Sequence, residues 1–507
     1  MKRIVSLLLV LAMMLTLAAC GGKAEAPKAD APAADAPAAD APAAEAPAVE
    51  VGEIGSPDAP VTVKVVCKDV FPDEEDVQAL CAAINEKMAA QGTYVDVQFV
   101  EPPASSYASA MPLAVMNGEV DADIIYFQGG DKPLADQGLL EDLTPYIAGS
   151  EYVKGLMDAS NVAQMESYPY LLWLAPPRVS TPVVRTDWLE GVTSYEALVA
   201  DPTPENYLTF FKELKEVNGA QYAFTMYGDL QKLDAFFNHA FGVTGTCVEE
   251  NGEWIFSKAS QAEKAKLEFY AQLYAEGLLD PDFLTLTWDV VEQRFYDGEA
   301  AIIAGTAGGV VQVYDQKMMS LYGDSAALTV LPPAKGVSQS YLSIDVTKEG
   351  RGYAINVDSE VKDAAWAVLE FMASPEGRIL DKVGIEGTHY TIENDQIVFT
   401  DKFAGWWARF WDTTNNFDPT PALAEPVLTP AASDSLAKVN EYMVMDHNLL
   451  IPEELTPQWD AMNQLYNEYA ADIVRGIKPI DAFDEFVEKW YANGGNDFHD
   501  LLQETFG

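Results

Sequence analysis

VTVKVVCKDVFPDEEDVQALCAAINEKMAAQGTYVDVQFV, residues 61–100, carries the pattern of a strand, a helix and a second strand. Val61–Val66 is apolar and rich in β-branched residues, which predicts a strand. Pro72 and the acids directly after it predict the start of a helix that runs to about Ala90, because acidic side chains stabilise the positive end of a helix dipole. Residues 94–100 alternate apolar and polar side chains and predict the second strand.

The same rhythm continues along the chain. Residues 107–117 predict a helix and residues 122–127 a third strand. A β-α-β-α-β order predicts an α/β fold, a parallel sheet with helices on both faces. Ligands of such sheets bind at the loops that follow the carboxyl ends of the strands.

The remaining chain is long for one hydrophobic core and typical of two lobes. Strands are also predicted over residues 300–304, 328–331 and 352–357, and helices over residues 205–217, 261–276, 290–297 and 364–372. The last hundred residues are predicted to be helical and are rich in aromatic side chains.

The N-terminus has the pattern of a secretory signal. Lys2 and Arg3 precede an apolar run over residues 5–17, which is short for a membrane span. Leu17-Ala18-Ala19-Cys20 resembles the bacterial lipobox, where the signal is cut before a cysteine that then carries lipid, such as palmitate. We expect a signal peptide over residues 1–19 and a lipidated Cys20; the alternative is an ordinary signal with an incidental cysteine.

Residues 20–57 are expected to form a tether. APAADAPAADAPAAEAPAVE, residues 31–50, cannot form a core and favours an extended, solvated chain with polyproline II character. At roughly 3 Å per residue it would reach up to ~100 Å from the membrane. Together with Cys20, this predicts a protein held by lipid alone on the extracellular face of a Gram-positive-like cell membrane.

Charge and cysteine content exclude some partners. The chain has 31 Lys and Arg against 79 Asp and Glu, a net charge of −48, which argues against nucleic acid and fits a soluble exported protein. Cys67, Cys81 and Cys247 form no C-x-x-C pair. Free buried thiols are favoured over a bridge between Cys67 and Cys81.

No motif for catalysis, metal or cofactor is present in the sequence. The histidines His239, His389, His447 and His499 are widely spaced, and residues 305–309 form a glycine-rich loop that lacks the lysine of a phosphate loop. Residues 72–76 do not have EF-hand spacing. We therefore expect no enzyme, no metal and no cofactor, although the many acids leave a glycan-processing hydrolase as an alternative.

Several blocks, in their order along the chain, resemble the family 1 extracellular solute-binding proteins, which include the maltodextrin-binding protein. The Gly384-Ile385-Glu386-Gly387 stretch is similar to the lipoprotein branch of Gram-positive bacteria. The blocks are residues 117–147, residues 183–192 (VVRTDWLEGV), residues 295–309 with 330–336, and residues 364–392.

The resemblance implies a two-lobed, periplasmic-binding-protein-like fold of type II, with the ligand between lobes that crossover strands join. Mapped onto this chain, one lobe takes residues 58–178 and 350–390, and the other takes residues 183–340 and 391–507. A ligand that touches both lobes favours the closed state. The implied function is the monomeric receptor of an ABC importer that delivers a sugar or oligosaccharide to membrane permease subunits. A peptide receptor and a sensor partner are alternatives.

A sugar site needs aromatic platforms and planar polar groups. Candidates follow predicted strands, lie near the crossovers or belong to GWWARFW, where a helix would put Trp407 and Trp411 on one face and Trp406 about 100° away. Arg178 suits a carboxylate on an acidic sugar or peptide. Core packing of the aromatic rings and solvation of Lys68 and Asp69 are the alternatives. The predicted ligand-binding residues are Lys68, Asp69, Phe127, Gln128, Asp131, Trp173, Arg178, Gly305, Thr306, Tyr341, Trp406, Trp407 and Trp411.

Overall fold

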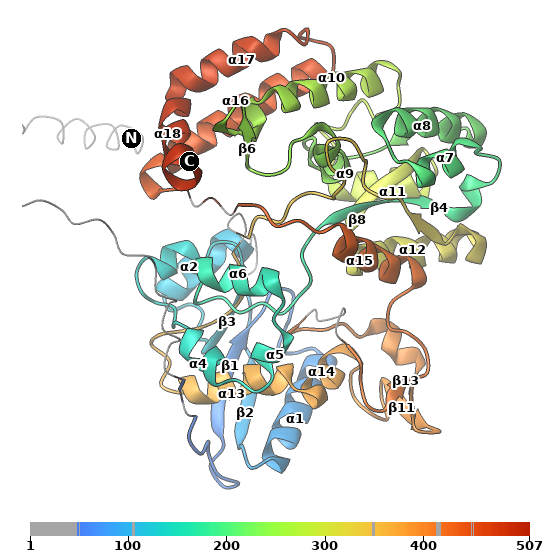
Figure 1. The fold of residues 1–507 in the computed structure, drawn as a ribbon. Coiled ribbons are helices and arrows are strands. Elements are labelled where there is room, and N and C mark those ends of the chain that lie inside the picture. The colour runs from blue at the N-terminus through green and yellow to red at the C-terminus, as the bar shows by residue number, and fades with distance from the viewer. Residues whose placement is uncertain are drawn as a thin grey trace, which may run out of the picture. The chain divides into compact units, whose positions relative to one another are not determined.

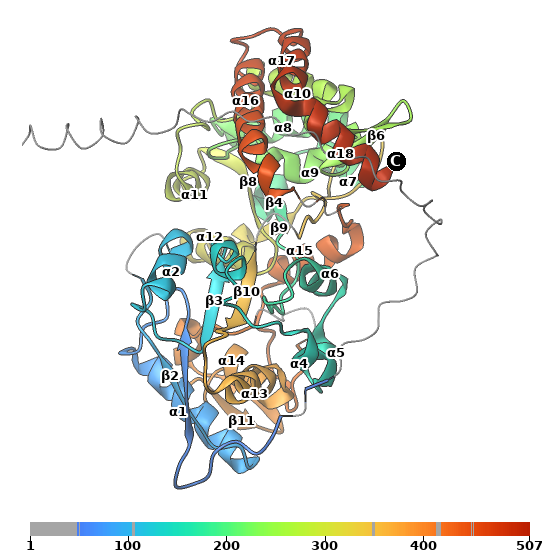
Figure 2. The same cartoon turned by 90° about the vertical axis from the view of Figure 1, so that its left-hand side faces the viewer.

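The computed structural model describes residues 48–49, 51–103, 107–346, 350–411, 417–447, 449 and 451–507. The predicted signal peptide, Cys20 and the tether up to residue 47 lie outside the described residues. Figures 1 and 2 show the described chain from two directions. Within it, no helix is both long and apolar enough to cross a bilayer.

The first lobe is built on a sheet with the strand order β10-β3-β1-β2. β1 (Val61–Val66) pairs in parallel with β2 (Val95–Phe99) and with β3 (Ile124–Gln128), so the predicted parallel arrangement is confirmed. β10 (Arg351–Ile355) returns from far along the chain and pairs antiparallel with β3. The carboxyl end of β3 therefore lies beside the start of β10, where Gln128 faces Arg351.

Helices cover this sheet. In α1 (Glu75–Ala90) the buried residues Val77, Leu80, Ile84 and Met88 recur at helical spacing and join the core with the strands. The other helices of this lobe are α2 (Tyr107–Met116), α3 (Lys132–Ala135), α4 (Thr144–Gly149), α5 (Val153–Leu156), α6 (Ala159–Ser167), α13 (Lys362–Ala373) and α14 (Pro375–Lys382).

The second lobe has its own sheet, with the order β5-β8-β4-β9. β8 (Ala300–Thr306) is buried along almost all its length and pairs antiparallel with β4 (Ser180–Arg185) and parallel with β5 (Tyr222–Phe224). β9 (Leu328–Val330) pairs antiparallel with β4. The strands predicted over residues 300–304 and 328–331 are thus confirmed as neighbours of β4.

Many helices surround the second sheet, and Figure 1 shows the C-terminal ones on the same side of the molecule as α8 and α10. α16 packs against α10 and α17. The elements are α7 (Ser194–Ala200), α8 (Pro204–Asn218), α9 (Gln231–Phe241), the hairpin β6 (Cys247–Glu250) and β7 (Glu253–Phe256), α10 (Gln261–Ala275), α11 (Trp288–Tyr296), α12 (Gly309–Tyr322), α15 (Pro430–Tyr442), α16 (Thr456–Val474), α17 (Ala482–Trp490) and α18 (Asn496–Phe506).

The chain leaves the first lobe later than the sequence suggested. A small sheet of β11 (Tyr390–Glu393), β12 (Gln396–Phe399) and β13 (Ala422–Leu423) follows α14. Trp406, Phe410 and Trp411 then belong to the first-lobe core, which corrects the assignment of residues 406–411 to the second lobe. The reason is packing: the Phe410 ring stacks on Tyr353 of β10 at 5.4 Å.

GWWARFW does not form a helix, which corrects the expected arrangement of its tryptophans. A short 3₁₀ turn, η4 (Asp401–Gly405), ends at the first residue of this stretch, and Trp406 has extended backbone. The backbone N–H groups of residues 409–411 donate to the carboxylate of Asp381 instead of to a helical ladder. The described cysteines Cys67, Cys81 and Cys247 are free, as favoured above.

Candidate ligand-binding site

Two cavities meet at the half-buried side chains of Trp173 and Arg351, which line both. One has a volume of about 580 Å³ and the other about 950 Å³. Each takes residues from both lobes. A site with contributions from both lobes is the arrangement in which a bound ligand favours closure.

The Trp173–Arg351 junction is held from several sides. The Trp173 ring packs on Tyr126 of β3 at 5.5 Å, and Arg351 Nη1 donates to the Tyr126 hydroxyl at 3.0 Å. Asn161 of α6 donates through Nδ2 to the Trp173 carbonyl at 2.9 Å. Gln164 donates to the Arg351 carbonyl. Two sheet strands and one helix therefore fix the place where the cavities join.

The larger cavity begins at the carboxyl ends of the first-lobe strands. Lys68 and Asp69 follow β1, and Gln128 ends β3. Asp69 has a positive φ of 59°, which is uncommon for a residue with a side chain and marks a tight turn at this edge. These positions are those at which parallel sheets present ligand contacts.

Asp381, at the end of α14, holds one wall of the larger cavity. Its buried carboxylate accepts hydrogen bonds from the backbone N–H groups of Arg409 at 2.7 Å and Trp411 at 2.9 Å. Its carbonyl accepts one from Trp406 Nε1 at 2.8 Å. Burial raises the pKa of Asp381, and the backbone N–H donors oppose that shift. A single acid thus positions the whole tryptophan-rich segment.

The tryptophans of this wall differ in exposure. Trp407 is 43% exposed, whereas Trp406 is 7% and Trp411 1% exposed. The guanidinium of Arg409 lies over the rings of Trp406 at 4.4 Å and Trp407 at 4.6 Å. Trp407 therefore presents ring surface to the cavity, while the other two rings mainly support it.

The second lobe contributes the start of α12 to the larger cavity. Gly309, Gln312 and Gln316 line it. Gly308, with φ of 76°, turns the chain from β8 into the helix, and its N–H donates to Ser435 of α15 at 2.9 Å. A Cβ on Gly309 would meet no atom within 4 Å, so the first turn of α12 faces open space.

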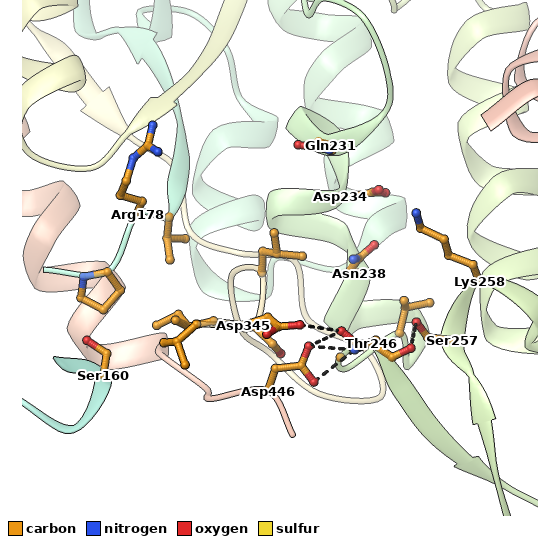
Figure 3. A pocket seen from close by; sticks show the side chains of 18 of the residues that line it. Ser160, Arg178, Gln231, Asp234, Asn238, Thr246, Ser257, Lys258, Asp345 and Asp446 are labelled. Carbon is orange, nitrogen blue, oxygen red and sulfur yellow. Dashed lines mark hydrogen bonds between the residues drawn. The ribbon is translucent and has the colours of Figure 1, made fainter. Parts of the chain in front are cut away.

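Thr246 organises the smaller cavity (Figure 3). Its hydroxyl donates toward Asp446 at 2.7 Å and Asp345 at 3.0 Å, and its backbone N–H donates to Asp446 at 2.9 Å. Arg178 and Lys258 lie on opposite sides of this view. Both also line the cavity, so its walls carry acidic and basic groups together.

A buried charged network forms the second-lobe wall of the smaller cavity. Lys266, 1% exposed, forms ion pairs with Asp234 at 2.7 Å and Glu263 at 3.0 Å. Burial lowers the pKa of Lys266, but these two carboxylates outweigh that effect and raise it. Asn238 accepts a further hydrogen bond from the amine at 2.7 Å. The lysine is therefore charged and fully engaged, which makes it a structural part of the wall.

Eight of the predicted ligand-binding residues line one cavity or both. Trp173 belongs to both, and Arg178 belongs to the smaller one. The larger cavity brings together predicted residues that are far apart in the sequence, since Lys68 and Trp411, 343 positions apart, both line it. These are Lys68, Asp69, Gln128, Trp406, Trp407 and Trp411.

The other predicted residues line neither cavity. Phe127 and Tyr341 are core residues, 0% and 1% exposed, and the Tyr341 hydroxyl donates to the carbonyl of Leu331 at 2.8 Å. Asp131 is 3% exposed and accepts a hydrogen bond from the Tyr170 hydroxyl at 2.9 Å. Burial raises the pKa of Asp131, a consequence of its place inside the lobe and not on an accessible loop.

Gly305 and Thr306 also lie outside both cavities. Gly305 is close to the ring of Tyr314, because a Cβ there would come within 2.7 Å of Cε2. The absence of a side chain at Gly305 therefore allows the Tyr314 ring of α12 to pack against β8. Thr306 ends β8 opposite Ser180. Gly309, later in the same loop, is the residue that reaches the cavity.

Sequence reasoning missed several residues that line the cavities. Arg351 starts β10, one position before the predicted strand, and Arg409 lies inside GWWARFW. Both are polar residues beside predicted features, which is the signal that could have found them. Gln312, Gln316 and Lys382 lie within helices and carry no comparable signal.

Family and structural comparisons agree with this geometry. A family model described as "Bacterial extracellular solute-binding protein" matches residues 72–379, more than half of the chain, so the chain belongs to that family. Lipoprotein LipO of Bacillus subtilis (strain 168) is 20% identical over 494 residues, which cover 88% of this chain and 92% of LipO.

Solved structures show the same two-lobed fold. The N-glycan transport solute binding protein NgtS of Streptococcus pneumoniae matches with a TM-score of 0.63 and 15% identity over 88% of this chain and 99% of its own. A solute binding protein of Bifidobacterium longum infantis, titled as HMO binding and associated with an ABC transporter, matches with a TM-score of 0.60 and 16% identity over 88% and 98%. The predicted family and fold class are therefore confirmed.

Among the residues that the structure describes, no group of three or more His, Cys, Asp or Glu side chains is placed to hold a metal ion. The family and the fold are those of solute-binding proteins. Hydrogen bonds such as those of Thr246 and Asp381 hold parts of the cavity walls in place, as in a preformed recognition site.

Proposed function

We propose that this protein is the receptor of an ABC importer and that its ligand is an oligosaccharide held between the two lobes. The observation that carries the proposal is the larger cavity. It combines the exposed ring of Trp407 with the planar amides of Gln128, from the first lobe, and Gln312, from the second. Ring surface suits the C–H face of a sugar, and amides suit its hydroxyls.

Cavity size supports an oligosaccharide over a single sugar. The larger cavity of about 950 Å³ is at the upper end for small-molecule sites, and the smaller one continues from it at Trp173. Binding across Gln128 and Gln312 would draw the lobes together, because the bound ligand contacts both only when they are near. Structural relatives include NgtS in complex with Man1GlcNAc and FusA of S. pneumoniae in complex with kestose, which supports a saccharide ligand.

A binding screen tests this proposal. Full-length protein, purified in detergent, would be melted with neutral and acidic oligosaccharides and with peptides of similar mass. A saccharide at 100 times its dissociation constant should stabilise the folded state by about 2.7 kcal/mol. Stabilisation by peptides alone would contradict the proposal and favour the peptide receptor.

Membrane attachment through Cys20 is part of the same proposal. It is supported by the Leu17-Ala18-Ala19-Cys20 sequence and by the similarity to a lipoprotein of Bacillus subtilis. Cells fed labelled palmitate should label the wild-type protein and not Cys20→Ser. Label that persists in Cys20→Ser would show that this cysteine is not the lipid attachment site.

Delivery to permease subunits is tested in cells. Deleting the gene should abolish uptake of the saccharide that the purified protein binds, and Trp407→Ala should reduce it. Normal uptake without the gene would contradict the importer role while leaving the binding result intact.

A further inference from the structure

Arg409 is a buried cation that forms no ion pair within the part of the chain that the structure describes. It is 4% exposed, and its guanidinium lies over the rings of Trp406 and Trp407. Its side chain donates one hydrogen bond among the described residues, from Nη1 to the Trp407 carbonyl, and no described carboxylate lies within 4.0 Å of it. Its Nε is buried with no hydrogen-bond partner among those residues. Buried charges are normally paired, so this arrangement calls for a partner.

The environment of Arg409 disfavours its charge. Burial lowers the pKa of Arg409, and the carboxylates of Asp381, Asp76 and Glu74 offset that effect only in part. The carboxylate of Asp381 is already engaged by backbone N–H groups. An additional negative group in the adjacent cavity would therefore be stabilised by a cation that the protein holds in place in advance.

Other donor groups belong to residues that line the same cavity. Trp411 Nε1 is buried with no hydrogen-bond partner among the described residues and belongs to a cavity-lining residue. The first turn of α12, the positive end of a fourteen-residue helix, faces the cavity at Gly309. Donors from the first lobe and a helix N-terminus from the second thus both favour a group that only accepts hydrogen bonds.

The charges that line the larger cavity differ from those of the whole chain. The basic residues that line it are Lys68, Arg351, Lys382 and Arg409, and the acidic ones are Asp69, Asp401 and Glu425. The chain as a whole has 31 basic and 79 acidic residues. A cavity with more bases than acids in so acidic a protein offsets the general repulsion that an anionic ligand would meet.

We infer that the larger cavity binds an acidic saccharide, with a ligand carboxylate placed against the Arg409 guanidinium. This inference rests on the proposed function and narrows its substrate class. The carboxylate accepts hydrogen bonds from the guanidinium, while the exposed ring of Trp407 supports the sugar that carries it. Methyl esterification of the ligand removes the charge and keeps the ring, which makes it a direct test.

The test compares each acid with its own methyl ester on full-length protein in detergent by titration calorimetry. The probes are short oligogalacturonides, sialyllactose, the methyl esters of both, and the neutral galacto-oligosaccharide and lactose. The acid should bind about tenfold or more tightly than its ester, as expected for a charge-assisted hydrogen bond. High salt should reduce that difference.

Variants test whether Arg409 is the source of the preference for the acid over its ester. Arg409→Gln should bring acid and ester to similar affinity, and Arg409→Lys should keep part of the preference. Arg378→Gln removes a guanidinium from α14 that lines neither cavity, and the preference should stay. If Arg409→Gln does not fold, the comparison of acid and ester on the wild-type protein decides whether the cavity prefers a carboxylate, and equal binding of the two overturns the inference.

The outcomes separate this inference from the function on which it rests. Neutral sugars or esters that bind as well as the acids, or an acid preference that Arg409→Gln retains, would overturn the inference and leave a saccharide receptor. Failure of every saccharide to bind would overturn both. An acid preference lost only in the Arg409 variants supports the carboxylate at this position.

Discussion

The carboxylate of Asp381 accepts a hydrogen bond from the backbone N–H of Trp411 at 2.9 Å, across 30 positions of the chain. The same carboxylate binds the N–H groups of Arg409 and Phe410. The end of α14 thereby sets the conformation of the wall that carries Trp407.

Asp381→Asn should weaken both this wall and ligand binding. The amide keeps one acceptor oxygen but places an NH₂ group against backbone donors, so buried donors lose their partner at a cost of about 1–3 kcal/mol of unfolding free energy. Denaturant unfolding and calorimetry would measure the two effects. Glu376→Gln, on the exposed side of the same helix, should change neither by more than about 0.5 kcal/mol. Equal effects of the two substitutions would contradict the role of Asp381.

Trp407→Ala and Trp411→Ala should affect different properties. Trp407 is 43% exposed, so its removal should weaken saccharide binding, by about 2 kcal/mol or more if it is a central contact, with little loss of stability. Trp411 is 1% exposed and packs on Tyr353, so its removal should cost about 3–5 kcal/mol of stability. Measuring the affinity per folded molecule and the unfolding free energy of both variants checks whether the two properties separate. A stability loss in Trp407→Ala as large as that in Trp411→Ala would show that both rings serve the core.

Lys266→Met should be strongly destabilising. It leaves Asp234 and Glu263 as neighbouring buried acids without their cation, at a cost of about 3–5 kcal/mol. Chemical denaturation at neutral pH measures the loss. Because protonation would relieve the repulsion, the deficit should shrink as the pH falls toward the range where carboxyl groups titrate. Lys264→Met, whose ion pair with Asp484 is exposed, is the matched control and should cost less than about 1 kcal/mol.

His239 ties α9 to the segment that leads back to β10. Its Nδ1 lies 3.0 Å from the Ser338 hydroxyl and its Nε2 lies 2.8 Å from the Ser343 hydroxyl, which itself donates to the carbonyl of Thr244. Ser343 therefore accepts from Nε2–H, and Nδ1 of the neutral ring accepts from the Ser338 hydroxyl when that hydroxyl does not donate to the His239 carbonyl, 3.2 Å away. Burial lowers the pKa of His239 from 6.5 to about 4.

The lowered pKa of His239 predicts that the stability of the fold depends on pH. Between pH 6.5 and 4 the unfolded chain binds a proton at this residue that the folded chain does not, so unfolding free energy falls as the pH falls. No stability is lost above about pH 6.5, and the loss of unfolding free energy reaches at most about 3 kcal/mol at pH 4. Melting curves of wild type and His239→Gln from pH 7.5 to 4.5 should show a smaller slope for the variant. Equal slopes would contradict a neutral, buried His239.

Sequence pattern was sufficient for the framework of the first lobe. Val61–Val66 was predicted with the bounds that the structure has, because its apolar, β-branched side chains are nearly all inside. Lys68, after β1, and Gln128, at the end of β3, both line the larger cavity. Alternation along β3 also explains why Phe127, predicted as a ligand contact, lines neither cavity. Consecutive strand residues face opposite sides, so Phe127 lies in the core while Gln128 lines the cavity.

What sequence pattern missed depends on contacts between distant segments. The helix expected through GWWARFW would need its backbone N–H groups, but Asp381 takes those of Arg409 and Trp411. Periodicity within seven residues contains no information on a carboxylate near position 381. Gln312 was missed for the same reason, since nothing within its own helix shows that this part of α12 lines the cavity.

The interleaved path of the chain limits how this protein can be recombined with its relatives. The polypeptide passes between the two sheets after Leu172, again between β9 and β10, and finally between β13 and α15. Neither lobe is a continuous stretch, so a gene fusion with one junction would give each lobe parts from two parents. A chimera that exchanges a complete lobe needs a junction in every one of these passages. New specificities are therefore expected to arise by point changes around the cavities, such as at Gln128 or Trp407, and not by the exchange of whole modules.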